Sequence, residues 1–138
     1  IDLPLSAYLP QEYVADLSTR LALYQRLAKL RSLQEIKEIK EEFADRFGKL
    51  PLPVENLLYA VSIRLLADRA DVQSISTEDK QIVIRMREGV KLNQAKLEAV
   101  CGQGIKLGTT QLRLDIKHLG NRWQKVLEEI IKHLSSEL

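Results

Sequence analysis

Hydrophobic residues recur at helical spacing through the first half of the chain, separated by polar positions. Residues 1–16 lack this pattern and hold Pro4 and Pro10, so they predict an extended lead-in and no regular element. Apolar residues at every third or fourth position then predict helices over 17–31 and 53–70, with another helix between them. The predicted buried stripe of the first helix is Leu17, Leu21, Tyr24, Leu27 and Ala28.

The second helix has signals at both of its ends. Ser32 and Glu35 have the spacing of a capping box, in which the two side chains bond backbone N–H groups of the first turn. Gly48 fits the glycine that follows many helices, and Pro51 prevents the helix from resuming. We therefore predict a helix over 33–47 that forms a hairpin with the first helix. Its predicted buried stripe is Ile36, Ile39, Phe43 and Phe47.

In the second half of the chain, apolar and polar residues alternate as they do in half-buried strands. This alternation predicts a β-hairpin from residues 72–76 and 81–86, joined by the four polar residues 77–80. A second hairpin is predicted from 105–107 and 112–116 around a Gly-Thr-Thr turn. The two hairpins together predict a small antiparallel sheet.

Two further helices complete the pattern. A short helix is predicted over 93–100, and a longer C-terminal helix begins at about Leu119. The resulting order αααββαββα predicts an α+β fold with an antiparallel sheet. We expect one domain over 1–138, with a helical half over 17–70 and a ββαββα half over 71–138. The predicted buried face of the C-terminal helix is Leu119, Trp123, Val126, Leu127, Ile130 and Leu134.

The composition is that of an ordinary globular protein. Of 138 residues, 45% are hydrophobic and 29% are charged, which excludes the disordered class. The net charge is only +2, and no basic tail indicates nucleic-acid binding. The sole cysteine, Cys101, cannot close an internal disulfide and fits a reducing compartment. With no signal peptide and no apolar run of about 20 residues, we expect no membrane contact and a cytoplasmic location.

The sequence holds no motif of an active site. The phosphate-binding pattern G-x-x-x-x-G-K-[ST] is absent, because GQGIKLG at 102–108 lacks the Lys-Ser/Thr ending and the helix that should follow. Cys101, His118 and His133 show neither the signature of a thiolate nucleophile nor a zinc-ligand spacing. We therefore predict no catalytic residue, no cofactor and no metal in this domain, and we expect it not to be an enzyme.

The second helix carries carboxylates at i, i+3, i+7 and i+10, within about 80° of a helical wheel and away from its apolar stripe. These residues, named the acidic ridge, are Glu35, Glu38, Glu42 and Asp45. Like charges at this spacing repel, and carboxylates near the carbonyl end of a helix are opposed by its dipole. The acidic ridge is therefore either a solvated face or a surface that binds a basic partner.

Basic residues gather on the predicted C-terminal helix. Arg122, Lys125 and Lys132 share one sector of that helix, with Glu129 between them. Such a stripe can bind the phosphates of nucleic acid. Its mixed charge and the lack of interleaved aromatic residues favour a solvated face. An accessory module that contacts the DNA backbone is therefore the alternative function.

Two stretches of the chain hold specific motifs: IDLPLSAYLPQEYVADLSTRLALYQRLA at 1–28 and EEFADRFGKLPLPVENLL at 41–58. In these motifs the chain resembles the C-terminal domain of the bacterial transcription-repair coupling factors. The resemblance covers roughly residues 1–70 by motif and continues in element order. It implies a parent protein that is an ATP-dependent DNA translocase, which binds double-stranded DNA, displaces stalled RNA polymerase and recruits nucleotide excision repair. ATP and Mg²⁺ would bind in a motor outside this chain.

The resemblance also implies a role for the acidic ridge. In that family, the C-terminal domain docks on an N-terminal UvrB-like module and covers the surface that UvrA would bind. Two of its carboxylates contact arginines there, and by motif they correspond to Glu42 and Asp45, with Glu35 and Glu38 as further candidates. The implied function is autoinhibition, in which this domain competes with UvrA for one surface.

Overall fold

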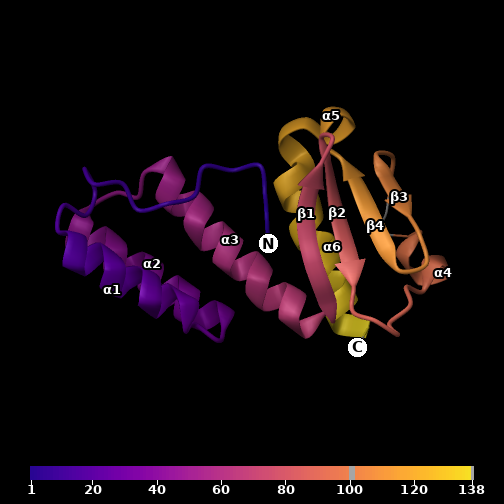
Figure 1. The fold of residues 1–138 in the computed structure, drawn as a ribbon, viewed down its shortest axis with the longest axis horizontal. Coiled ribbons are helices and arrows are strands. Elements are labelled where there is room, and N and C mark those ends of the chain that lie inside the picture. The colour runs from indigo at the N-terminus through magenta and orange to yellow at the C-terminus, as the bar shows by residue number, and fades with distance from the viewer. Residues whose placement is uncertain (100–101, 138) are drawn as a thin grey trace. The chain divides into compact units, whose positions relative to one another are not determined.

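The computed structural model describes residues 1–99 and 102–137, and its contacts divide the chain into two compact units. The helical unit is Leu5–Leu65, and the sheet unit is Ile1–Pro4 together with the residues from Leu66 onward. The predicted α+β fold, with N-terminal helices and a small antiparallel sheet, is confirmed (Figure 1). That the whole chain is a single domain stays a prediction.

Three helices follow an extended lead-in, as predicted. α1 (Leu17–Ala28) and α2 (Leu33–Phe47) lie side by side as a hairpin, and α3 (Leu52–Arg69) comes after them (Figure 1). Asp16 caps α1, because its carboxylate accepts a hydrogen bond from the Thr19 N–H at 2.9 Å. α1 therefore begins directly after the residue whose side chain caps it.

The connection between α1 and α2 is longer than predicted. α1 ends at Ala28, before the predicted end at Arg31. Ser32 is already extended as the N-cap of α2, so the chain must leave α1 earlier. The Ser32 hydroxyl oxygen accepts from the Glu35 N–H at 3.2 Å, which confirms this half of the capping box. At the other end, Gly48 has a φ of +93°, a conformation that favours glycine.

The buried face of α1 differs from the predicted one. Leu17, Leu21 and Tyr24 of the predicted stripe are exposed, with 60%, 55% and 36% of their surface accessible. Leu23 and Leu27 are the buried residues of this helix. The prediction was wrong for Leu17, Leu21 and Tyr24, and also for Ala28, which is exposed. The reason is that α1 has apolar residues on two faces, and helical spacing does not show which face meets the core.

The core of the helical unit is built by all three helices and by the lead-in. Phe43 of α2 is completely buried, and Ile36 and Ile39 of the predicted stripe are buried with it. Phe47, the last residue of that stripe, is partly buried. The other helices and the lead-in contribute Leu9, Val14, Leu23, Leu27, Val54, Leu58, Val61 and Leu65. Because this face of α2 is buried, its other side faces solvent.

The sheet unit contains a four-stranded antiparallel sheet with the strand order β1-β2-β4-β3. Its strands are β1 (Val72–Glu78), β2 (Gln81–Met86), β3 (Ile105–Leu107) and β4 (Gln111–Asp115). Ile82, Val83 and Ile84 of β2 are consecutive and fully buried. Since successive side chains of a strand point to opposite faces, both faces of the sheet are covered at β2.

The first hairpin has a tighter turn than predicted. The turn consists of Asp79 and Lys80 alone, whose φ values are +48° and +60°, so the strands extend to Glu78 and resume at Gln81. Two central residues with positive φ give a turn whose twist matches that of the flanking strands. The four-residue turn over 77–80 is therefore corrected to two residues.

The short helix predicted over 93–100 is observed as α4 (Gln94–Leu97), with the Asn93 side chain accepting from the Lys96 N–H. Its predicted end at Val100 and the neighbouring Cys101 lie outside the described residues. Leu97 is completely buried and anchors this helix in the sheet unit.

The C-terminal helix begins later than predicted. α5 (Ile116–Leu119) and the 3₁₀ turn η1 (Gly120–Arg122) come first, and α6 (Trp123–Glu137) follows. Gly120 has a φ of +56°, which interrupts the helix predicted to begin at Leu119. α6 lies against one face of the sheet (Figure 1). The predicted face residues that are buried are Leu119, Trp123, Leu127, Ile130 and Leu134.

Candidate functional site

The acidic ridge lies on α2, on the side that the core leaves to solvent. Glu38 and Asp45 are exposed, whereas Glu35 and Glu42 are half-buried. The residues that keep this orientation are the buried Ile36, Ile39 and Phe43 of the same helix. The structure therefore places the predicted site residues on one helix, with two of them less accessible than the wheel alone suggests.

Glu42 is bound by two arginines. The Arg26 guanidinium of α1 donates to its carboxylate from Nη1 to Oε2 at 2.5 Å and from Nη2 to Oε1 at 2.7 Å. Arg46, one turn further along α2, places Nη1 3.6 Å from Oε2. The hydrogen bonds from Arg26, aided by the charges of both arginines, hold the pKa of the Glu42 carboxyl below its ordinary value of 4.5 despite partial burial. Glu42 is therefore an ionised group with an internal partner.

The other carboxylates of the acidic ridge have different surroundings. The Ser32 hydroxyl donates to Glu35 Oε1 at 3.2 Å, and the Gln34 amide donates to Glu38 Oε1 at 3.4 Å. The Asp45 carboxylate forms no hydrogen bond and no ion pair with any residue that the structure describes. Of the two carboxylates matched to the family motif, Asp45 is thus the one available to a partner.

The C-terminal end of α2 carries groups that counter its negative dipole. The Tyr13 hydroxyl lies 3.1 Å from the Phe43 carbonyl oxygen and 2.8 Å from that of Gly48. Arg46 supplies a positive charge in the last turn, where the helix dipole favours cations. The ordinary pKa of a tyrosine, 10.0, already makes the Tyr13 hydroxyl a donor at neutral pH, and partial burial raises that pKa further. These contacts explain how the helix end tolerates Glu42 and Asp45.

Reasoning from the sequence missed Arg26 and Tyr13 as neighbours of this site. Arg26 is 16 residues from Glu42, and Tyr13 is 30 residues from Phe43, so no local spacing connects them. The predicted hairpin of two helices was the one signal available, because it brings a basic and an acidic helix side together. Its register depends on packing, which the sequence pattern does not give.

The basic residues of the alternative function do not form a stripe on one helix. Arg122 lies in the 3₁₀ turn η1, whereas Lys125 and Lys132 lie in α6. Lys132 Nζ pairs with Glu128 Oε1 at 3.2 Å, and this ion pair partly neutralises the charge of Lys132. This arrangement does not strengthen the case for binding the DNA backbone.

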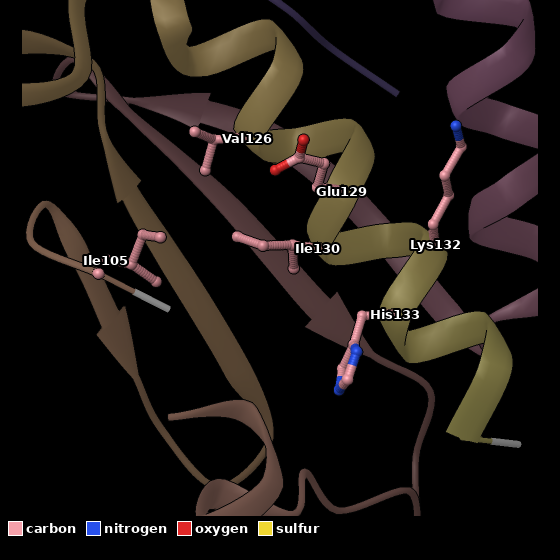
Figure 2. A pocket seen from close by; sticks show the side chains of 7 residues that line it. Ile105, Val126, Glu129, Ile130, Lys132 and His133 are labelled. Carbon is pink, nitrogen blue, oxygen red and sulfur yellow. The ribbon is translucent and has the colours of Figure 1, made fainter. Parts of the chain in front are cut away.

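The sheet unit has an open pocket of about 610 Å³ between β3 and α6. Figure 2 shows that Ile105 of β3 faces Val126 and Ile130 of α6, whereas Lys132 points away from these apolar side chains. His133 borders the pocket and also interacts with another residue. Three of the seven described lining residues are aliphatic, and the polar ones, Glu129, Lys132 and His133, include no hydroxyl or thiol nucleophile.

Neither a metal site nor a membrane-spanning helix is found within residues 1–99 and 102–137. Within these ranges, no three His, Cys, Asp or Glu side chains are grouped so that they could hold a metal ion. In the same part of the chain, no helix combines the length and the apolar character needed to cross a bilayer.

The fold and the site define a class: an α+β domain with a charged α2 face formed by the acidic ridge and its two arginines. The model of the TRCF domain family matches residues 3–97, which is more than half of the 138 residues. The chain belongs to this family.

Relatives of the chain carry the name transcription-repair-coupling factor. The protein from Rickettsia typhi is 35% identical over 72% of this chain, and the chain covers 9% of that protein. For Escherichia coli K12, the identity is 34% over 70% of the chain and 8% of the relative. The protein of Buchnera aphidicola is 33% identical over 91% of the chain and 16% of the relative. The chain thus spans a small part of the length of these relatives.

A solved structure has the same fold. The crystal structure of the C-terminal domain of a transcription-repair coupling factor superposes with a TM-score of 0.81 at 22% sequence identity. The match covers 99% of this chain and 92% of that one. The likeness includes the second half of the chain, where sequence motifs alone did not reach.

Proposed function

We propose that the chain is the regulatory C-terminal domain of a transcription-repair coupling factor. In this proposal, the acidic ridge docks on arginines of an N-terminal UvrB-like module of the same protein and masks the surface that binds UvrA. The parent protein uses ATP and Mg²⁺, held in a motor outside this chain, to displace stalled RNA polymerase from double-stranded DNA. Release of the domain then exposes the surface to UvrA.

The observation that carries the proposal is the state of Asp45. Its carboxylate is exposed on α2, three residues from Glu42, and it has no ion pair or hydrogen bond within the described part of the chain. It also stands near the negative end of a helix dipole, where an unpaired carboxylate is unfavourable. An arginine of a docking partner would offset the unfavourable charge of this carboxylate, because a charge-assisted hydrogen bond to a carboxylate is among the stronger polar contacts.

The strength of such docking suits a reversible contact. Ion pairs between exposed groups contribute about 0 to 1 kcal/mol each and weaken as salt is added. Two modules of one chain reach an effective concentration of about millimolar where the intervening chain lets them meet, so a few weak contacts are enough to keep them together. The masked state should therefore persist at low salt and open when another partner engages the parent protein.

The proposal is tested with the full-length parent protein carrying Asp45→Arg. Reversal of this charge replaces an attraction with a repulsion, so docking should weaken and UvrA should bind about three- to tenfold more tightly. The measurement is the dissociation constant for UvrA at low and at high salt. The gain should shrink at high salt, where the native contact is already screened.

Glu12→Arg is the matched control for this charge reversal. Glu12 is exposed in the same helical unit but lies in the lead-in, outside α2. Its reversal changes the net charge equally and should leave UvrA affinity unchanged. Equal UvrA affinity for the native protein and Asp45→Arg would contradict the proposed masking.

A further inference from the structure

We propose that Arg26 is an internal competitor for Glu42, which keeps one of the two docking carboxylates occupied until a partner arginine displaces it. This inference rests on the proposed function and adds a residue that sets how strongly the domain docks. It assigns unequal parts to the two carboxylates: Asp45 binds a partner directly, whereas Glu42 must first leave Arg26.

The geometry of the pair supports competition. Arg26 meets Glu42 with both terminal nitrogens, one on each carboxylate oxygen. This fork-to-fork arrangement is the same one that a partner arginine would use. A second arginine cannot take that position while Arg26 holds it.

The charge around Glu42 leads to the same conclusion. Arg26 and Arg46 both lie within 4.0 Å of this one carboxylate, so the three side chains together carry a net charge of +1. An approaching arginine is repelled by this group at close range. The attraction of the α2 face for a basic surface comes instead from Asp45 and Glu38, which are exposed and form no ion pair within the described ranges.

Arg26 also has room to move. Its side chain is 48% exposed, and it borders a shallow groove of about 350 Å³ between α1 and α2. Small side chains line the groove, among them Ser18, Thr19 and Ala22 of α1. The guanidinium can therefore turn away from Glu42 by rotation of its side chain, without displacement of either helix.

The experiment compares UvrA affinity in three variants of the full-length parent protein. Arg26→Gln frees Glu42 and should tighten docking, so UvrA should bind about two- to fivefold more weakly than to the native protein. Arg26→Lys keeps the charge but cannot bind both carboxylate oxygens through two nitrogens. The UvrA affinity of this variant should fall between those of the native protein and Arg26→Gln. Lys37→Gln removes the same charge from an exposed site on a different side of α2 and should have no such effect.

The direction of the change separates this inference from the proposed function. If Asp45→Arg strengthens UvrA binding but Arg26→Gln leaves it unchanged or strengthens it, the competitor role is wrong and masking stands. If Asp45→Arg has no effect, the proposed function itself fails. An equal weakening in Lys37→Gln would assign the result to net charge and overturn the specific role of Arg26.

A second measurement tests the pair itself. The pKa of the Glu42 carboxyl, followed by NMR, should be higher in Arg26→Gln than in the native protein, because Arg26 lowers it. An unchanged pKa would contradict the pair.

Discussion

α1 and α2 are neighbouring helices of one unit, yet they divide their apolar residues differently. In α2 the apolar residues form one stripe, and Ile36, Ile39 and Phe43 of this stripe are buried. α1 has apolar residues on two faces, and the buried residues Leu23 and Leu27 leave the other face in solvent. A single stripe therefore identifies the core side of a helix, whereas two stripes leave the choice to tertiary packing.

The largest effect is expected from the stripe of α2. Phe43 is completely buried in the core of the helical unit. Phe43→Ala removes its ring contacts and leaves a cavity, so the free energy of unfolding should fall by about 3 to 5 kcal/mol. Urea unfolding followed by circular dichroism measures this loss. A loss below about 1 kcal/mol would mean that α2 does not pack through this face.

A sharper test compares two leucines of α1 that are two positions apart. Leu23→Ala should lower the free energy of unfolding by about 2 to 5 kcal/mol, because Leu23 is buried. Leu21→Ala should change it by no more than about 0.5 kcal/mol, because Leu21 is 55% exposed. Both substitutions make the same chemical change in the same helix, so each is the control for the other. The reverse order would restore the stripe predicted from spacing alone.

The element order of this chain was predictable because its signals are local. The Ser32 cap and the Gly48 end of α2 lie within one turn of the residues they affect, and the alternation in 72–86 marks the first hairpin. The interruption of the last helix at Gly120 was missed, because an isolated glycine can also be accommodated inside a helix. Boundaries that depend on one φ value are less visible in a sequence than periodic patterns.

The candidate site was predictable only in part. Helical spacing placed Glu42 and Asp45 on one side of α2, and the family motif selected them from the acidic ridge. The contact between Arg26 and Glu42 joins two helices, so it depends on how their side chains interlock. That contact changes the interpretation of the site, because it gives the two carboxylates unequal access to a partner.

The smallest effect is expected from this pair between α1 and α2. Glu42→Gln should lower the free energy of unfolding at pH 7 by less than about 1 kcal/mol, since both partners are partly exposed. The pKa of Glu42 is lowered in the folded state, so its stabilising contribution is complete above the unfolded value near 4.5 and is lost as the pH falls through the folded value. Urea unfolding at pH 7 and at acidic pH should therefore show a difference between native and Glu42→Gln proteins that disappears in acid. Asp45→Asn is the matched control and should not lower the free energy of unfolding at pH 7, because Asp45 has no ion pair within the described residues and its charge is opposed by the helix dipole. A difference that persists in acid, or equal effects of both substitutions, would contradict an ionic link between the two helices.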